Sequence, residues 1–244
     1  MKKLNLIELE SQIKKTCGLK NPKLVNSDGL WKQNVILKFL EENKISPRRI
    51  LDIGAGCANV SLYLIKEYGS EYVGVDHSTK DLEDFNAALD LNNLNSEKVE
   101  YEVADFLQYK SDKRFDLIYD ICSIAHFNPA KEITANDGFY QSAVIVNSIL
   151  EEDGYFMVST DCHEENKPNH RGEINVEYIS PDQIIESIEK AGFTLINDPL
   201  FLSSSDINSA GLNGITLNRV DGGVDFDPRH QDFYDRVFLV FKKS

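Results

Sequence analysis

The chain has 244 residues, of which 41% are apolar, and this is enough for one α/β domain with additions. Acidic residues outnumber basic ones by 40 to 26, and the net charge of −14 argues against nucleic acid or an anionic membrane surface as a partner. Four scattered cysteines include no Cys-x-x-Cys pair, and no apolar run is long enough for a membrane span or a signal peptide. We therefore expect a cytoplasmic protein with free thiols and no metal.

The first 43 residues precede the first predicted core strand and contain two amphipathic segments. Residues 5–16 carry apolar side chains at helical spacing. Ser27 and Asp28 can cap a second helix, whose apolar face contains Trp31, Val35, Phe39 and Leu40. We interpret residues 1–43 as a helical cap over a ligand cleft.

The most informative segment is residues 48–59, which read Arg-Arg-Ile-Leu-Asp-Ile-Gly-Ala-Gly-Cys-Ala-Asn. A short apolar strand, a Gly-x-Gly turn and a helix form the nucleotide cradle of an open α/β sheet. We place Asp52 at the mouth of this turn, where its carboxylate would repel the pyrophosphate that dinucleotide-binding turns receive. The segment therefore favours a ligand with a cationic amine and no phosphate, such as S-adenosylmethionine.

Strands and helices then alternate along the chain, which predicts a parallel sheet. Further strands are predicted at 71–76, 99–106, 115–120, 150–159, 193–196 and 237–241. Those at 71–76 and 115–120 end in aspartate. Helices are predicted at 80–92 and 138–150, and a third begins at a Ser180–Gln183 capping box and stops at Gly192. The polar stretches 161–178 and 203–232 follow the later strands and are expected as loops at the ligand-binding edge.

Five ordered motifs resemble those of the class I S-adenosylmethionine-dependent methyltransferases. They are Asp52-x-Gly54-x-Gly56, Asp76, Ala104-Asp105-Phe106, Phe115-Asp-Leu-Ile and Leu150-x-x-Asp-Gly154, within about residues 48–198. One departure is Ala58, where the family often has a third glycine. The resemblance implies an α/β, Rossmann-like, seven-stranded and mostly parallel sheet, with helices on both faces and an antiparallel last strand. We expect one domain over residues 1–244, with the loop 203–232 over the active site.

The resemblance also implies the residues that bind the cofactor, S-adenosyl-L-methionine. Asp76, 22 residues after Gly54, would bind the ribose hydroxyls beside His77, and Asp105 the adenine amino group. The full predicted set is Asp52, Gly54, Gly56, Asp76, His77, Asp105, Phe106 and Asp120. Structural alternatives remain, since Asp76 can cap the next helix and Phe106 can be a core residue.

The segment from Asp120 to Phe127 resembles small-molecule methyltransferases whose fourth strand ends in Tyr-Asp and precedes a histidine. This implies that Asp120 lies under the sulfonium and that His126 faces the acceptor. A neutral histidine can take the proton of a hydroxyl during methyl transfer. Alternatively, His126 only shapes the pocket, because alignment of the reactants can drive methyl transfer. The amino-group signature Asn/Asp-Pro-Pro-aromatic is absent, which favours an oxygen acceptor.

The polar stretch after the fifth strand supplies the predicted substrate-binding residues His163, Glu164 and Arg171. His126, after the fourth strand, is the fourth member of this predicted set. We expect them to bind a small polar metabolite, such as a sugar or a nucleotide-activated sugar. A divalent metal on Asp161, His163 and Glu164, or a solvated loop, are the alternatives. We expect the arginines near the last strand, among them Arg236, to pair with aspartates close in sequence. The sequence thus predicts a small-molecule O-methyltransferase, with a carboxyl or N-methyltransferase and a non-catalytic partner subunit as rivals.

Overall fold

The computed structural model describes residues 1–4, 7–22, 27–94, 96–127, 133–163, 179–202 and 235–244. A mixed sheet crosses the molecule in the order β1-β8-β9-β6-β5-β2-β3-β4, with β7 also paired to β9. Its strands are β1 (Lys2–Lys3), β2 (Arg49–Ile53), β3 (Glu71–Asp76), β4 (Val99–Val103), β5 (Phe115–Ile121), β6 (Leu150–Cys162), β7 (Phe193–Leu195), β8 (Leu200–Leu202) and β9 (Asp235–Lys243).

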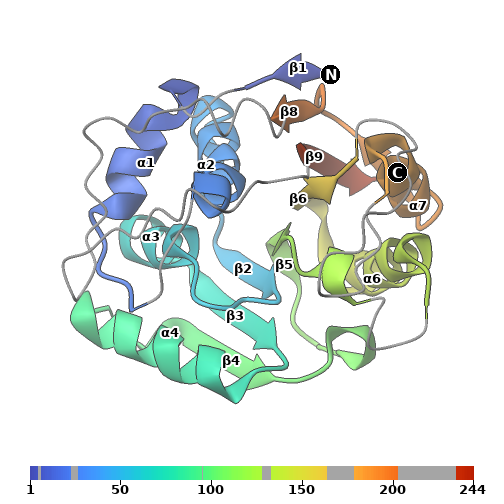
Figure 1. The fold of residues 1–244 in the computed structure, drawn as a ribbon. Helices are drawn as coiled ribbons and strands as arrows, with labels where there is room; N and C mark the ends of the chain where they lie inside the picture. Colours follow the sequence, from blue (N-terminus) through green and yellow to red (C-terminus); the bar gives the residue numbers. More distant parts are fainter. Residues whose placement is uncertain (5–6, 23–26, 95, 128–132, 164–178, 203–234) are drawn as a thin grey trace.

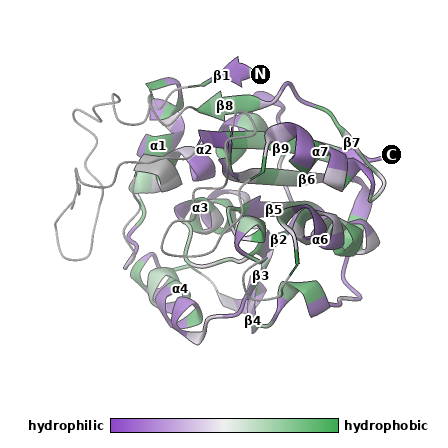
Figure 2. Ribbon diagram, turned by 45° about the vertical axis from the view of Figure 1, so that its right-hand side comes forward, coloured by the Kyte–Doolittle hydropathy of each residue, from purple (hydrophilic) through white to green (hydrophobic). Residues whose placement is uncertain are grey.

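Helices cover both faces of the sheet, as expected (Figure 1). One face carries α1 (Glu10–Cys17), α2 (Ser27–Glu42), α3 (Asn59–Tyr68) and α4 (Thr79–Leu91), which share one apolar cluster with the sheet. The other face carries α6 (Ala135–Ile149) and α7 (Pro181–Glu189) over a second cluster. Short 3-10 turns are η1 (Ile7–Leu9), η2 (Ser96–Lys98), η3 (Phe106–Gln108) and η4 (Ile124–His126). Figure 2 shows hydrophobic and hydrophilic residues mixed along α4 and α6, as in helices with one buried face.

The predicted sheet topology is confirmed. Strands β4, β3, β2, β5 and β6 pair in parallel, and the last strand, β9, runs antiparallel to β6. Among the described residues the sheet contains nine strands, two more than expected. The additions are β1 and β8, which pair with each other at the edge of the sheet, and β8 also pairs with β9.

The predicted sixth strand, 193–196, corresponds to β7, and residues 196–199 separate it from β8. There the side-chain oxygen of Asn197 accepts the backbone N–H of Val240 at 2.7 Å, in place of a backbone carbonyl. Pro199, which has no N–H to donate, comes immediately before β8. A side-chain contact and a proline thus separate β7, which was predicted, from β8, which was not.

Helix boundaries follow the local signals closely. The capping box before α7 is confirmed, because Ser180 Oγ accepts the Gln183 N–H at 3.3 Å and Gln183 Oε1 accepts the Ser180 N–H at 3.0 Å. Gly192 ends this segment with a φ of +89°. The predicted loop at 203–232 lies outside the described residues, as does most of 161–178. None of the described helices is long and apolar enough to cross a membrane.

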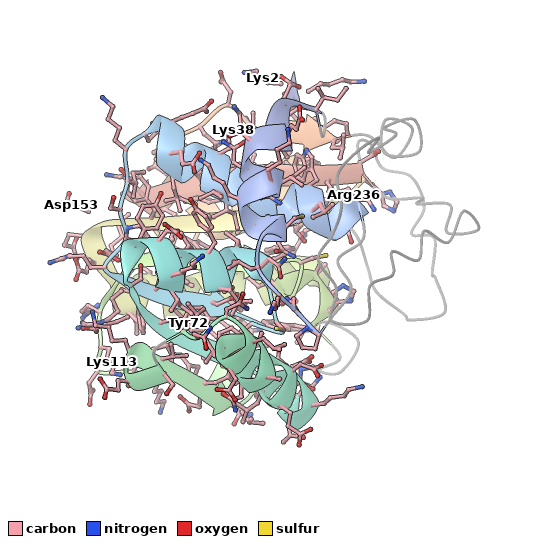
Figure 3. All side chains as sticks on the ribbon, turned by 90° about the vertical axis from the view of Figure 1, so that its left-hand side faces the viewer. Lys2, Lys38, Tyr72, Lys113, Asp153 and Arg236 are labelled. Atoms are coloured by element: carbon pink, nitrogen blue, oxygen red, sulfur yellow. The ribbon has the colours of Figure 1, made fainter. Side chains whose placement is uncertain are left out.

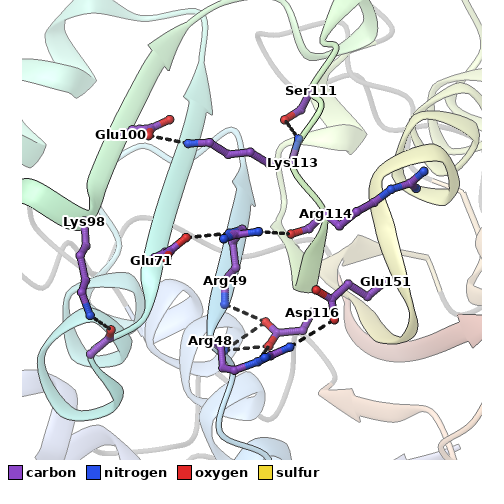
Figure 4. Close-up of polar contacts among 11 residues, drawn as sticks. Arg48, Arg49, Glu71, Lys98, Glu100, Ser111, Lys113, Arg114, Asp116 and Glu151 are labelled. Atoms are coloured by element: carbon purple, nitrogen blue, oxygen red, sulfur yellow. Dashed lines mark hydrogen bonds and ion pairs between the residues drawn. The ribbon is translucent and has the colours of Figure 1, made fainter.

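The two edges of the parallel strands differ in character. Figure 4 shows the amino edge, where the Asp116 carboxylate accepts the backbone N–H groups of Arg48 and Arg49 at 2.9 Å each. Arg49 also pairs with Glu71 at 2.7 Å, and such exposed pairs contribute little stability. Figure 3 shows Arg236 on the opposite side of the molecule from Asp153, which lies at the amino end of β6. Most of the predicted functional residues that the structure describes lie at or after the carboxyl ends of β2, β3, β4, β5 and β6.

Candidate active site at the carboxyl edge

The glycine turn after β2 can be built only with glycine at its first position. Gly54 and Gly56 have φ angles of +63° and +48°. A Cβ on Gly54 would lie 2.1 Å from Ser123 Oγ, and this hydroxyl donates to the Gly54 carbonyl at 3.0 Å. The turn therefore packs directly against the segment that follows β5.

Several N–H groups around this turn already have acceptors. Asp76, at the end of β3, accepts the Gly56 N–H at 3.0 Å through Oδ2 and the Ser78 N–H at 2.9 Å through Oδ1. At the start of α3, the Val60 N–H donates to Gln33 Oε1 of α2 at 3.3 Å. A pyrophosphate would need such N–H groups for itself. The occupied turn fits a cofactor without phosphate, which supports S-adenosylmethionine over a dinucleotide. His77 follows Asp76, with Nδ1 3.4 Å from Oδ1.

Asp52 lies inside β2 rather than at the mouth of the turn, so its predicted place was wrong. The strand continues through Ile53, and the Asp52 side chain is only 1% exposed. Its Oδ2 accepts the hydroxyls of Ser61 and Tyr72, each at 2.8 Å. Burial raises the pKa of Asp52 to about 8, and the hydrogen bonds oppose this rise. The residue fastens α3 to the sheet below the turn, and its contact with the cofactor amine stays a prediction.

Asp105 and Phe106 follow β4 at the same edge. Asp105 caps η3 by accepting the Leu107 N–H at 3.1 Å. The ring of Phe106 is buried and stacks on Tyr109 with 5.9 Å between centroids. The Phe106 side chain is therefore part of the core, and the predicted contact with adenine remains for its backbone.

Asp120 is fully buried near the end of β5. Its Oδ1 accepts the N–H groups of Ser123 at 2.8 Å and Ile124 at 3.0 Å. Its Oδ2 has no hydrogen-bond partner among the described residues. Burial raises the pKa of Asp120 to about 7, while the backbone N–H groups and the Lys32 cation oppose the rise. Ser123, whose N–H donates to Asp120, also donates its hydroxyl to the Gly54 carbonyl, so the Asp120 carboxyl lies next to the glycine turn. A carboxyl in this position suits a cationic group of a ligand.

His126 lies at the end of η4, two residues beyond the N–H pair held by Asp120. Its Nε2 is 3.8 Å from Cys122 Sγ, and the Cys122 thiol donates to Asp161 Oδ2 at 3.1 Å. Cys122 adopts a φ of +63°, which is unfavourable for a residue with a Cβ and turns the chain sharply after β5. Although part of the residue is exposed, desolvation lowers the pKa of His126. Asp161 opposes this effect and Lys32 adds to it.

Sequence reasoning missed Lys32, and it placed Arg236 with other partners. Lys32 Nζ of α2 lies 2.8 Å from Asp161 Oδ1, and Arg236 Nε of β9 lies 3.3 Å from the same oxygen. All three side chains are buried: Lys32 is 7% exposed, Arg236 1% and Asp161 10%. A lysine within the apolar stretch of α2 was the available signal. Its partner, however, lies far along the chain, on β6.

The other predicted substrate residues are only partly described. His163 is buried after β6, and its N–H donates to the Ile179 carbonyl at 3.2 Å. Glu164 and Arg171 lie outside the described residues. Within the described part of the chain, no three His, Cys, Asp or Glu side chains are grouped to hold a metal ion. Asp161 instead faces two cations, and the metal alternative stays untested at Glu164.

Comparison with known proteins identifies the family. A family model described as "Methyltransferase domain" matches residues 46–194, which is more than half of the chain. The chain belongs to this methyltransferase family. Family membership confirms that the protein is an enzyme and that its cofactor is S-adenosyl-L-methionine.

Individual relatives are distant. The chain is 24% identical over 139 residues to a probable chloroplastic tocopherol O-methyltransferase of Oryza sativa subsp. japonica, covering 57% of this chain and 34% of that protein. The chain therefore matches only about a third of the rice protein's length.

Solved structures share the fold. The O-methyltransferase of a trans-AT PKS multienzyme of Brevibacillus brevis, in complex with S-adenosyl-L-homocysteine, superposes with a TM-score of 0.63. The two chains are 16% identical, and the superposition covers 87% of this methyltransferase and 72% of the Brevibacillus brevis protein. The [4+2]-cyclase SpnF gives the same TM-score and identity, with coverage of 86% and 81%. At such identities the likeness concerns the fold alone.

Proposed function

We propose that this methyltransferase transfers the sulfonium methyl group of S-adenosylmethionine to a hydroxyl oxygen of a small polar acceptor. The single observation that carries the choice of oxygen is the position of His126, two residues beyond the backbone N–H pair that Asp120 accepts, where desolvation lowers the pKa of the imidazole. A hydroxyl must lose its proton as the methyl group arrives, and a neutral imidazole is suited to take it. The similar rice protein, a probable tocopherol O-methyltransferase, supports the same choice.

The chain's own residues have distinct parts in this proposal. When bound, the cofactor supplies an electrophilic methyl group on a positively charged sulfur. The glycine turn, Asp76 and Asp105 orient it, and the carboxyl of Asp120 faces its positive charge. Alignment of the acceptor oxygen with the methyl carbon provides most of the rate, and proton removal by His126 comes second.

The acceptor pocket is proposed to lie between this edge and the N-terminal cap. Residues of the cap already contact the cofactor turn, since Asn21 Nδ2 donates to the Cys57 carbonyl at 2.8 Å. We keep His163, Glu164 and Arg171 as proposed substrate-binding residues. A sugar or a nucleotide-activated sugar is the proposed acceptor, because a polyhydroxylated molecule suits the polar stretch after β6.

The test is the pH–rate profile of a His126→Ala variant. We expect turnover to fall roughly 10²–10⁴-fold while the affinity for S-adenosylhomocysteine stays nearly unchanged. The wild-type rate should fall as the pH drops through the pKa of His126, because only neutral imidazole accepts a proton. Near wild-type turnover in the variant would remove His126 as the base.

A carboxyl methyltransferase is the rival that the same experiment separates. A carboxylate acceptor carries no proton at neutral pH, so its methylation needs no base. For such an acceptor, His126→Ala would leave the rate and its pH dependence unchanged. An N-methyltransferase is separated by the product, whose new methyl group would be bonded to nitrogen.

A further inference from the structure

Helix α2, which belongs to the N-terminal cap, contributes a buried cation to the carboxyl edge. Lys32 leaves only 7% of its side chain exposed, and its Nζ lies 2.8 Å from Asp161 Oδ1. The family match begins at residue 46, so this lysine lies outside the matched region. A buried lysine without a counter-ion is costly, and the ion pair with Asp161 explains how Lys32 is tolerated there.

A continuous chain of contacts runs from Lys32 to His126. Lys32 and Arg236 hold Asp161 Oδ1, while Asp161 Oδ2 accepts the thiol of Cys122 at 3.1 Å. Cys122 Sγ then lies 3.8 Å from His126 Nε2. The cation of α2 and the carboxylate of β6 are therefore linked to the imidazole through the Cys122 thiol.

We propose that Lys32 is a positioning residue of the reaction centre, which fixes the Asp161 carboxylate and keeps His126 in its neutral, proton-accepting form. The effect on the rate rests on the proposed role of His126 as base, whereas the effect on the charge of His126 does not. The N-terminal cap would thus complete the reaction centre as well as cover it.

The charges around His126 act in opposite directions. Lys32 lowers the pKa of His126 and Asp161 raises it. Lys32 also opposes the rise in the pKa of Asp120, so one cation favours a neutral imidazole and an ionised carboxyl together. Other charged or titratable groups described at this end of the sheet include Cys122, Cys162, Asp235 and Arg236, which interact with one another, and the buried His163.

The experiment is a histidine titration by nuclear magnetic resonance on the full chain, with the His126 signal assigned by its loss in His126→Gln. Lys32→Met removes the charge and should raise the pKa of His126. Asp161→Asn should lower it. Lys38→Met, on the same helix but in an exposed pair with Glu42, should leave it unchanged.

A purely structural role for Lys32 would not shift the titration in opposite directions for the two partners. Lys32→Arg, which keeps the charge, should titrate like the wild type. If Lys32→Met does not fold, Lys32→Gln serves as the second neutral variant. A His126 pKa that stays constant or falls in a folded, neutral Lys32 variant overturns the proposal.

The pH–rate profile separates this inference from the proposed function. In Lys32→Met the acidic limb of kcat/KM should move to higher pH, so that the rate falls several-fold at low pH and recovers at high pH. If the titration moves and the profile does not follow it, Lys32 still controls the charge of His126, and His126 is not the base. If neither moves, the role of Lys32 is refuted while His126→Ala still tests the base.

Discussion

The buried carboxyl of Asp120 predicts that the protein distinguishes S-adenosylmethionine from S-adenosylhomocysteine more strongly as the pH rises. The pKa of Asp120 is raised to about 7 in the free protein, and Oδ2 has no partner among the described residues. The positive sulfur of S-adenosylmethionine favours the ionised carboxylate and lowers this pKa on binding. Binding therefore releases a proton at acidic pH, and the affinity falls as the pH drops below 7.

The size of this effect follows from the titration. Between pH 8.5 and pH 5.5, the ionised fraction of a group with a pKa of about 7 falls from about 97% to about 3%. The ratio of the two dissociation constants, S-adenosylhomocysteine over S-adenosylmethionine, should therefore fall about 30-fold over this range. Using a ratio cancels groups that affect both ligands alike. Calorimetry at several pH values measures it, and Asp120→Asn should make the ratio independent of pH. A constant ratio in the wild type, or an unchanged slope in Asp120→Asn, would refute the placement of Asp120 under the sulfonium.

Three further predictions concern the cofactor site, the fold and the cap. Asp76→Ala should weaken S-adenosylhomocysteine binding by about 1.5–3 kcal/mol, or roughly 10- to 150-fold in Kd by calorimetry, because a charged acceptor is lost; unchanged affinity would exclude Asp76 from the ribose site. Ser180→Ala should lower the free energy of unfolding by about 1 kcal/mol in urea titrations and leave kcat unchanged, since its capping box lies on α7. Hydrogen exchange should slow in residues 1–43 and 203–232 when cofactor and acceptor bind, and unchanged exchange in both would contradict their assignment as pocket walls.

The glycine turn and Asp76 could be predicted from the sequence because their structure is decided locally. A positive φ strongly favours glycine, and an acid at the end of the second parallel strand must lie near the turn after the first. The place of Asp52 was predicted wrongly from its closeness to Gly54 along the chain. The alternation of side chains along β2 would have placed it on a buried face instead. It shares a face of β2 with Ile50, two residues earlier, and that face packs under α3.

The Lys32–Asp161–Arg236 cluster could not be predicted in the same way. Its members come from α2, β6 and β9, and only the tertiary fold brings these elements together. A lysine in the apolar stretch of a helix indicates a buried partner but does not identify it. The unpredicted strand β8 is similar, because it forms by pairing with β1 and β9, which lie far from it along the chain.

Transfer of an isotopically labelled methyl group from S-adenosylmethionine tests the central claim most directly. The purified enzyme is incubated with a pool of hydroxylated small molecules that includes sugars and nucleotide-activated sugars, and the products are analysed by mass spectrometry and nuclear magnetic resonance. We predict that the label appears on an oxygen atom of a small-molecule product, and that the His126→Ala variant transfers much less label. A protein that binds the cofactor yet transfers no label, or that places it on nitrogen or on a macromolecule, would contradict the account.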